Sequence, residues 1–118
     1  MHTFIFKTDP TPFSRPARNS YLLQKDIDFR EYLAIVGNRQ MKLQRLPIFD
    51  TPMEVNINLY RKRKPTDPRF GDIDNHLKNI LDALNGVIWK DDRLILNLCC
   101  TKNFSDIPKI IIDVEAIT

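Results

Sequence analysis

Polar and apolar residues alternate strictly from Glu54 to Tyr60, which predicts a half-buried β-strand. From Arg93 to Cys100 an apolar residue stands at every second position, namely Leu94, Leu96, Leu98 and Cys100, and an isoleucine-rich run follows from Lys109 to Ile117. Two more strands are therefore predicted near the end of the chain. A further strand is expected at residues 3–7, because they are rich in β-forming side chains and stop at Asp9-Pro10.

The segment from Lys25 to Leu46 is predicted to be a helix. Its apolar residues fit a 3.6-residue period only loosely, and Asp26 or Asp28 is expected to cap its start. Gly37 is a candidate interruption of this helix, and Pro47 closes the segment.

A second helix is predicted further along the chain, and it is clearly amphipathic. Asp74 or Asn75 is expected to cap its start, and Gly86 its end. Its apolar residues recur at i, i+3, i+4, i+7 and i+11, which places them on one buried face: Leu77, Ile80, Leu81, Leu84 and Ile88.

The predicted element order is therefore β-α-β-α-β-β, which belongs to the α+β class: a mixed β-sheet with two main helices packed on it. The chain has 118 residues, so we expect a single domain spanning residues 1–118. Its apolar runs are only a few residues long, whereas a membrane helix needs about 20. Residues 1–7 lack the pattern of a secretory leader, so a cytoplasmic protein is expected.

Charge is distributed unevenly. The 18 Lys and Arg residues exceed the 15 Asp and Glu residues by only three, a balance too mild to indicate nucleic-acid binding. Residues 61–71, however, form a predicted exposed loop with two prolines, a glycine and five basic residues: Arg61, Lys62, Arg63, Lys64 and Arg69. Cys99 and Cys100 are adjacent and cannot join distant parts of the chain, so we expect two small strand residues.

Four carboxylates flank the second predicted helix. Asp72 and Asp74 come just before it, and in an extended chain their two-residue spacing points both side chains the same way. Asp91 and Asp92 follow the next turn. They reach the same place only if the segment after Gly86 doubles back along a helix about 16 Å long.

Three carboxylates held together repel one another unless a cation neutralises them, and oxygen ligands suit Mg²⁺ or Mn²⁺. Such an ion orients or deprotonates a water and stabilises charge on a phosphate, which points to phosphodiester hydrolysis. Lys78 and Asp82 follow Asp74 at successive helical turns. Taken alone, these three residues also fit a solvated charge ladder.

These residues carry a family resemblance. The run from Gly71 to Gly86, followed by Trp89-Lys90-Asp91-Asp92, resembles the signature of the RusA family of Holliday junction resolvases. Those enzymes are small, dimeric, Mg²⁺-dependent endodeoxyribonucleases. Their pattern is Asp-x-Asp-Asn-x-x-Lys, then Asp-Ala-Leu, then an Asp-Asp pair at the start of a strand, and this sequence matches each element.

The resemblance implies a homodimer, bacterial or phage-encoded, that resolves four-way DNA junctions in recombination and repair by paired symmetric nicks. It assigns Asp72, Asp74 and Asp92 as ligands of Mg²⁺, for which Mn²⁺ can substitute, and Lys78 as the essential lysine, which would steady the attacking water or the charge on the scissile phosphate. The supporting residues that it implies are Asn75, Asp82 and Asp91, with Asn75 as a cap and Asp82 holding Lys78.

A DNA-binding surface is expected beside these carboxylates. The basic residues of the 61–71 loop abut Asp72 in sequence, and phosphate contacts of this kind weaken steeply with salt. A second candidate patch comprises Arg15, Arg18 and Lys25. Phe70, expected to be exposed, would insert into a base step at the open centre of a junction.

Other functions stay open at this point. Asp-x-Asp also occurs in haloacid dehalogenase-like phosphatases and sugar-nucleotide transferases, but in the phosphatases an apolar strand precedes the first aspartate, whereas here Arg69-Phe70-Gly71 does. A non-catalytic branched-DNA-binding module would lack a carboxylate or the lysine, and none is missing. A nuclease for flaps or forks would use the same residues, and these residues indicate no cleavage preference or protein partner.

Overall fold

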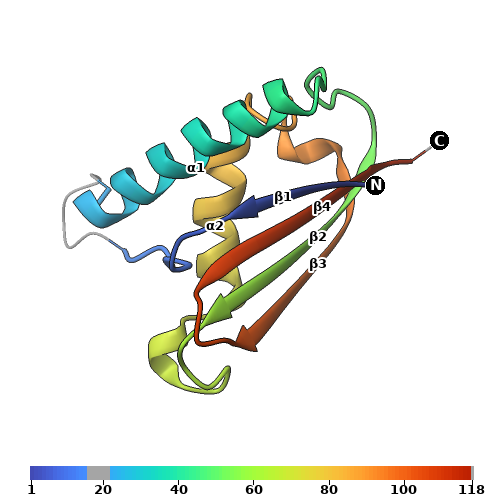
Figure 1. The fold of residues 1–118 in the computed structure, drawn as a ribbon. Coiled ribbons are helices and arrows are strands. Elements are labelled where there is room, and N and C mark those ends of the chain that lie inside the picture. The colour runs from blue at the N-terminus through green and yellow to red at the C-terminus, as the bar shows by residue number, and fades with distance from the viewer. Residues whose placement is uncertain (16–21, 118) are drawn as a thin grey trace.

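The computed structural model describes residues 1–15 and 22–117 (Figure 1). These residues form the predicted order of elements: β1 (His2–Phe6), α1 (Gln24–Leu43), β2 (Met53–Arg61), α2 (Ile73–Leu84), β3 (Ile95–Phe104) and β4 (Lys109–Ala116). Two short 3₁₀ turns, η1 (Pro68–Phe70) and η2 (Asp92–Leu94), precede α2 and β3. None of the helices in residues 1–15 and 22–117 combines the length and the apolar character needed to cross a membrane.

The four strands form one mixed sheet in the order β1-β4-β2-β3. β4 pairs antiparallel with both β1 and β2, whereas β3 pairs parallel with β2. Figure 1 shows α1 and α2 on the same side of this sheet, with α1 running across α2. The predicted α+β class is confirmed, and β1 and β3 are the two edges of the sheet.

The core lies between the sheet and the two helices. Along β2, Val55, Ile57 and Leu59 are almost completely buried while Glu54 and Asn56 are exposed, so the alternation in the sequence reflects one covered face. Other fully buried large side chains come from all parts of the fold, including the start of β2, the turn η1 and the segment after α2: Phe4, Phe6, Leu33, Met53, Phe70, Ile80, Leu84, Ile88, Trp89, Ile110 and Ile112.

Helix α1 differs from its prediction at two points. Its N-cap position is Leu23, without a side-chain cap, so neither Asp26 nor Asp28 caps it. Gly37 does not interrupt the helix but is buried within it. A Cβ at this position would lie 3.1 Å from Leu84, so the missing side chain is what lets α1 approach the end of α2.

Helix α2 also begins earlier than predicted. Asp72 occupies its N-cap position, and its extended backbone has φ −73° and ψ 149°. Neither Asp74 nor Asn75 is therefore the cap, because both already lie inside the helix. The predicted end is confirmed, since the C-cap is Asn85 and Gly86 follows with a φ of +79°.

Candidate functional site

Asp72 and Asp74 stand at the start of α2. Asp74 lies in the first helical turn, so the expected extended spacing of the two residues is wrong. Both residues are exposed, and in the described part of the chain neither forms an ion pair. The N-terminal end of a helix favours negative charge, because the unpaired backbone N–H groups of the first turn point out of that end. Two carboxylates without ion-pair partners among the described residues therefore lie at the start of α2, where the helix dipole stabilises negative charge.

Asp92 lies at the opposite end of the same helix. Asn85, at the C-cap of α2, accepts a hydrogen bond from the Asp92 backbone N–H at 3.0 Å and donates one to the Asp92 carboxylate at 3.3 Å. The helix between Asp74 and Asn85 is about 16 Å long at 1.5 Å per residue. The segment after Gly86 therefore does not double back along the helix, as an intrachain site would require.

Asp91 has a local role. Its backbone occupies the N-cap position of η2, and its carboxylate accepts a hydrogen bond from the Arg93 backbone N–H at 2.9 Å. Asn85 also accepts a hydrogen bond from the Trp89 indole at 2.9 Å, so the turn after α2 is fastened at several points. This turn explains why Asp92 stays at the C-terminal end of α2.

The donor set suits a hard cation only in part. Across residues 1–15 and 22–117, no three His, Cys, Asp or Glu side chains come together as a metal-binding group. The exposed oxygens of Asp72 and Asp74 are nevertheless of the kind that Mg²⁺ prefers. These two carboxylates fit a cation, whereas the third ligand predicted from sequence, Asp92, is not brought to them within one chain.

Lys78 turns toward the N-terminal loop. Its Nζ atom lies 5.1 Å from the centre of the Phe13 ring, a distance typical of a cation–π contact. Asp82 does not hold Lys78, because its carboxylate pairs with Arg30 at 3.3 Å. The charge ladder Asp74-Lys78-Asp82 is therefore absent from the described residues, and the expected support of Lys78 by Asp82 is wrong.

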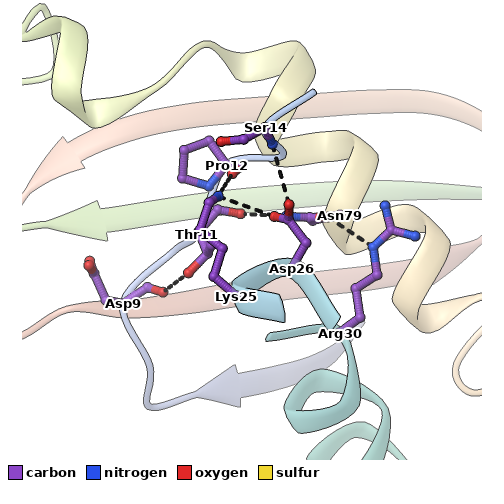
Figure 2. A network of polar contacts seen from close by, with 8 residues as sticks. All are labelled: Asp9, Thr11, Pro12, Ser14, Lys25, Asp26, Arg30 and Asn79. Carbon is purple, nitrogen blue, oxygen red and sulfur yellow. Dashed lines mark hydrogen bonds and ion pairs between the residues drawn. The ribbon is translucent and has the colours of Figure 1, made fainter. Parts of the chain in front are cut away.

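A buried carboxylate fastens the loop that carries Phe13. The Asp26 side chain is completely buried and accepts a hydrogen bond from Asn79 at 2.8 Å (Figure 2). The Ser14 backbone N–H also points to it at 3.5 Å, and the Lys25 ammonium lies 3.3 Å away. A buried carboxylate needs such partners, because leaving it without them costs several kcal/mol.

Asn79 connects that carboxylate to the rest of the site. It donates a second hydrogen bond to the Thr11 carbonyl and accepts one from Arg30, each at 2.9 Å (Figure 2). One turn earlier in α2, the Asn75 carbonyl accepts a hydrogen bond from the Phe13 backbone N–H at 2.9 Å. The loop is thus held against the first two turns of α2, which carry the candidate catalytic residues.

Arg61 belongs to the core rather than to the DNA-binding surface expected of it. It is nearly buried at the end of β2 and makes a two-pronged ion pair with Asp9, with both nitrogen–oxygen distances 3.0 Å. It also donates to the carbonyls of Arg69 and Phe70 at 2.9 and 2.7 Å. The β2 alternation simply continues to residue 61 and turns this side chain inward.

Phe70 is fully buried, so its expected role as an exposed wedge in DNA is wrong. Its ring packs edge-on against His76, with ring centres 5.7 Å apart. The charged ends of Arg61 and Lys102 lie 5.7 and 5.3 Å from the ring centre. Phe70 therefore anchors the turn that leads into Asp72.

His76 is a structural residue beneath this turn. Its Nε2 atom lies 2.6 Å from the Phe70 carbonyl, which can only accept, so Nε2 carries the proton. Nδ1 is buried and has no partner among the described residues. Burial lowers the pKa of His76 to about 4, helped by the nearby charges of Arg61 and Lys102, so the ring stays neutral at pH 7.

The exposed basic residues beside Asp72 are fewer than the sequence suggested. Lys62, Arg63 and Lys64 form no ion pairs with the described residues. Arg69 is exposed but pairs with Asp67 at 2.9 Å, and this hydrogen-bonded pairing lowers the pKa of Asp67 to about 2. The candidate surface near the carboxylates therefore consists of the 62–64 segment and, at its edge, Arg69.

The second basic patch is only partly described. Arg15 is exposed, whereas Arg18 lies outside the described residues. Lys25 donates to the Pro12 carbonyl at 2.9 Å as well as pairing with Asp26, so it fastens the N-terminal loop rather than reaching outward. Among the described residues of this patch, Arg15 is therefore the one whose charge is exposed and not engaged by the N-terminal loop.

Lys102 is a residue at the site that sequence reasoning missed. It lies on β3 and donates to the Gly71 carbonyl at 3.3 Å, one residue before Asp72. The available signal was a lysine continuing the apolar face of the predicted strand, two residues beyond Cys100. Lys102 places a positive charge beside the turn that carries the first carboxylate.

Two comparisons with known proteins bear on this site. The chain is 27% identical over 112 aligned residues to "Uncharacterized protein YqaN" of Bacillus subtilis (strain 168), covering 80% of this chain and 72% of that protein. The sequence model of the family described as "Endodeoxyribonuclease RusA" matches residues 8–115, which include the N-terminal loop, both helices and all four flanking aspartates. The chain belongs to the RusA family of endodeoxyribonucleases.

Proposed function

We propose that this protein is a Mg²⁺-dependent endonuclease that resolves four-way DNA junctions by paired symmetric nicks. The observation that carries the proposal is the pair of uncommitted carboxylates, Asp72 and Asp74, at the start of α2, with Lys78 one turn further on. Membership of the RusA endodeoxyribonuclease family supports cleavage of phosphodiester bonds in DNA.

In this proposal Asp72 and Asp74 would hold the cation. Because Asn85 keeps Asp92 at the far end of α2, Asp92 would be a third ligand only from a second subunit. When bound, the cation supplies polarisation of the attacking water and neutralisation of charge on the phosphate. Lys78 brings a second positive charge to the same end of α2, where it stabilises the charge that develops on the phosphate oxygens. Phe13 and the loop behind it limit where the Lys78 ammonium can go.

The basic segment Lys62–Lys64 attracts the DNA backbone to the carboxylates. If these three side chains each neutralise one phosphate, replacing all three by glutamine reduces the slope of log affinity against log salt by about 2.7. A matched control replaces Arg39, Lys42 and Arg45, three exposed basic residues toward the far end of α1 and just beyond it, by glutamine (Figure 1). An equal loss of slope in both triple variants contradicts the assignment of the 62–64 segment.

A symmetric dimer fits the substrate. A four-way junction is resolved by two equivalent cuts, and a two-fold dimer presents two equivalent sites. We therefore propose that the active protein is a homodimer, with each site cutting one of the two strands.

The deciding experiment measures cleavage of a synthetic four-way junction with and without Mg²⁺, beside duplex, flap and single-strand controls. We expect Mg²⁺-dependent, symmetric nicking of the junction by the wild type and binding without cutting by Asp74→Asn. Glu31→Gln, which neutralises an exposed carboxylate on α1, serves as the matched control. Absence of metal-dependent nicking by the wild type refutes the enzyme, and equal cutting of flaps refutes junction selectivity.

A further inference from the structure

We infer that Lys102 and Phe104, at the end of β3, form a subsite that binds one nucleotide of the DNA beside Asp72. The Lys102 ammonium binds a phosphate, and the Phe104 ring stacks on a base. The inference rests on the proposed function, and it identifies side chains that engage the substrate next to the candidate catalytic carboxylates.

Lys102 lies against the turn that leads into Asp72. Its Nζ atom donates to the Gly71 carbonyl at 3.3 Å and lies 5.3 Å from the centre of the Phe70 ring. Arg61 already fastens this turn, because its guanidinium donates to the Phe70 carbonyl at 2.7 Å. An ammonium has three N–H donors, so Lys102 keeps donors for a ligand after its bond to Gly71.

The charge of Lys102 is not balanced within the described ranges. It is the one charged residue of β3, it is partly buried, and it forms no ion pair there. The neighbouring Arg61, by contrast, pairs with Asp9 at 3.0 Å. Partial burial of an unpaired ammonium costs free energy, which an anionic ligand offsets. The DNA on which this family acts supplies such a ligand in its phosphates.

Phe104 lies on the same face of β3 as Lys102. In the register with β2, Lys102 is beside Leu59 and Phe104 is beside Arg61, and both of these β2 side chains are buried on the helix-facing side. At about 3.3 Å per residue, Lys102 and Phe104 are separated by about 6.6 Å along the strand. Phe104 is 56% exposed, so its ring offers a free surface on which a base can stack.

The subsite adjoins the basic segment Lys62–Lys64. The Ser105 N–H donates to the Arg61 carbonyl at 2.9 Å, which fastens the end of β3 beside the start of that segment. Figure 1 shows the ends of β2 and β3 and the start of α2 at the same end of the sheet. A DNA strand drawn in by Lys62–Lys64 therefore passes Phe104 and Lys102 as it reaches the carboxylates.

A base that stacks on Phe104 must first leave its own stack. Unstacking costs a few kcal/mol in intact duplex and least where a base is already unpaired. The open centre of a four-way junction offers such bases more readily than a duplex does. The Phe104 contact should therefore favour branched DNA, whereas the Lys102 contact with a phosphate should serve both kinds of DNA.

Salt titrations test the phosphate contact. Fluorescence anisotropy without Mg²⁺ measures the affinity for a synthetic four-way junction of the wild type, Lys102→Gln, Lys102→Arg and the matched control Lys42→Gln on α1. We expect Lys102→Gln to reduce the slope of log affinity against log salt by about 0.9, and the other two variants to keep the wild-type slope. A lysine that only fastens the turn leaves this slope unchanged, and that result overturns the phosphate contact.

Phe104→Ala tests the base contact, with Leu43→Ala as the matched control at a 76% exposed residue of α1. We expect Phe104→Ala to weaken junction binding about tenfold, with little effect on duplex binding or on the salt slope, and Phe104→Trp to keep the affinity. Equal weakening for junction and duplex, or none for either, overturns the stacking. A change in the sedimentation of Phe104→Ala also overturns it, because the ring then contacts a second copy of the chain.

These outcomes differ from those that decide the proposed function. A wild type that binds junctions without nicking them in Mg²⁺ refutes the proposed nuclease, and the anisotropy measurements still decide the subsite. A wild type that binds and nicks junctions, beside Lys102→Gln and Phe104→Ala variants with its own slope and affinity, refutes the subsite alone. A wild type without affinity for junctions overturns both.

Discussion

The buried guanidinium of Arg61 allows a quantitative prediction, because it fixes the turn that leads into Asp72. Arg61→Met keeps most of the length of the side chain and removes four hydrogen bonds, two to Asp9 and two to the carbonyls of Arg69 and Phe70. Each hydrogen bond made by a charged group contributes about 1.5–3 kcal/mol.

The free-energy contributions of the four hydrogen bonds are not lost in full. The Asp9 side chain is 55% exposed and regains water, and the Phe70 carbonyl keeps its contact with His76 at 2.6 Å. We therefore expect a loss of about 3 kcal/mol in the free energy of unfolding. For a domain of this size that corresponds to a fall of about 12 °C in Tm.

Thermal and urea unfolding followed by circular dichroism measure this loss. Arg63→Met, at a nearby arginine without an ion pair in the described structure, is the matched control and should stay within about 0.5 kcal/mol of the wild type. Arg61→Lys should lose most of the same stability, because an ammonium cannot reproduce the fork on Asp9. A Tm for Arg61→Met equal to that of Arg63→Met would refute the reasoning.

Three further predictions concern the neighbourhood of the site and β3. The pKa of His76 is about 4 in the folded protein against 6.5 in the unfolded chain. In metal-free buffer the free energy of unfolding should therefore keep its highest value above pH 6.5 and fall by about 3 kcal/mol as the pH drops toward 4. Urea titrations should show a smaller fall for His76→Gln. Gly71→Ala should cost at least about 3 kcal/mol or abolish folding, measured by the same unfolding assay, because φ is +95° and a Cβ would lie 2.7 Å from Pro12. Burial raises the pKa of Cys100 to about 11, so a thiol reagent at pH 8 should label the exposed Cys99 first, and rapid labelling of Cys99→Ser would contradict this.

The elements of this fold could be predicted from local patterns. The alternation around Val55 and Ile57 and the helical spacing of Ile80 and Leu84 follow from which face of each element is covered, and the structure confirms both. The same holds for Gly86, whose positive φ ends α2 as its position predicts. These signals depend only on residues close in sequence, which is why they suffice for the element order.

The roles of individual charged and aromatic residues followed from contacts between distant parts of the chain. Arg61 and Phe70 stand in a segment whose composition is that of an exposed basic loop, yet both side chains are buried. Asp9, 52 residues before Arg61, pairs with the Arg61 guanidinium, which in turn bonds to the Phe70 carbonyl. Asp26 fits a helix cap in sequence, but in space it meets Asn79, 53 residues later. No local pattern reports such pairs.

The sequence by itself determined which residues can do chemistry, whereas the tertiary structure decided which of them can act together. The spacing of Asp72, Asp74 and Lys78 already indicated one group of functional side chains, because a helix start holds them within a turn or two. The position of Asp92 relative to these residues depended on the path of the chain after α2, and Asn85 holds Asp92 at the far end of that helix. The physical reason is that a rigid helix separates its ends by its full length, so within one chain Asp92 stays far from the two carboxylates at the start of α2.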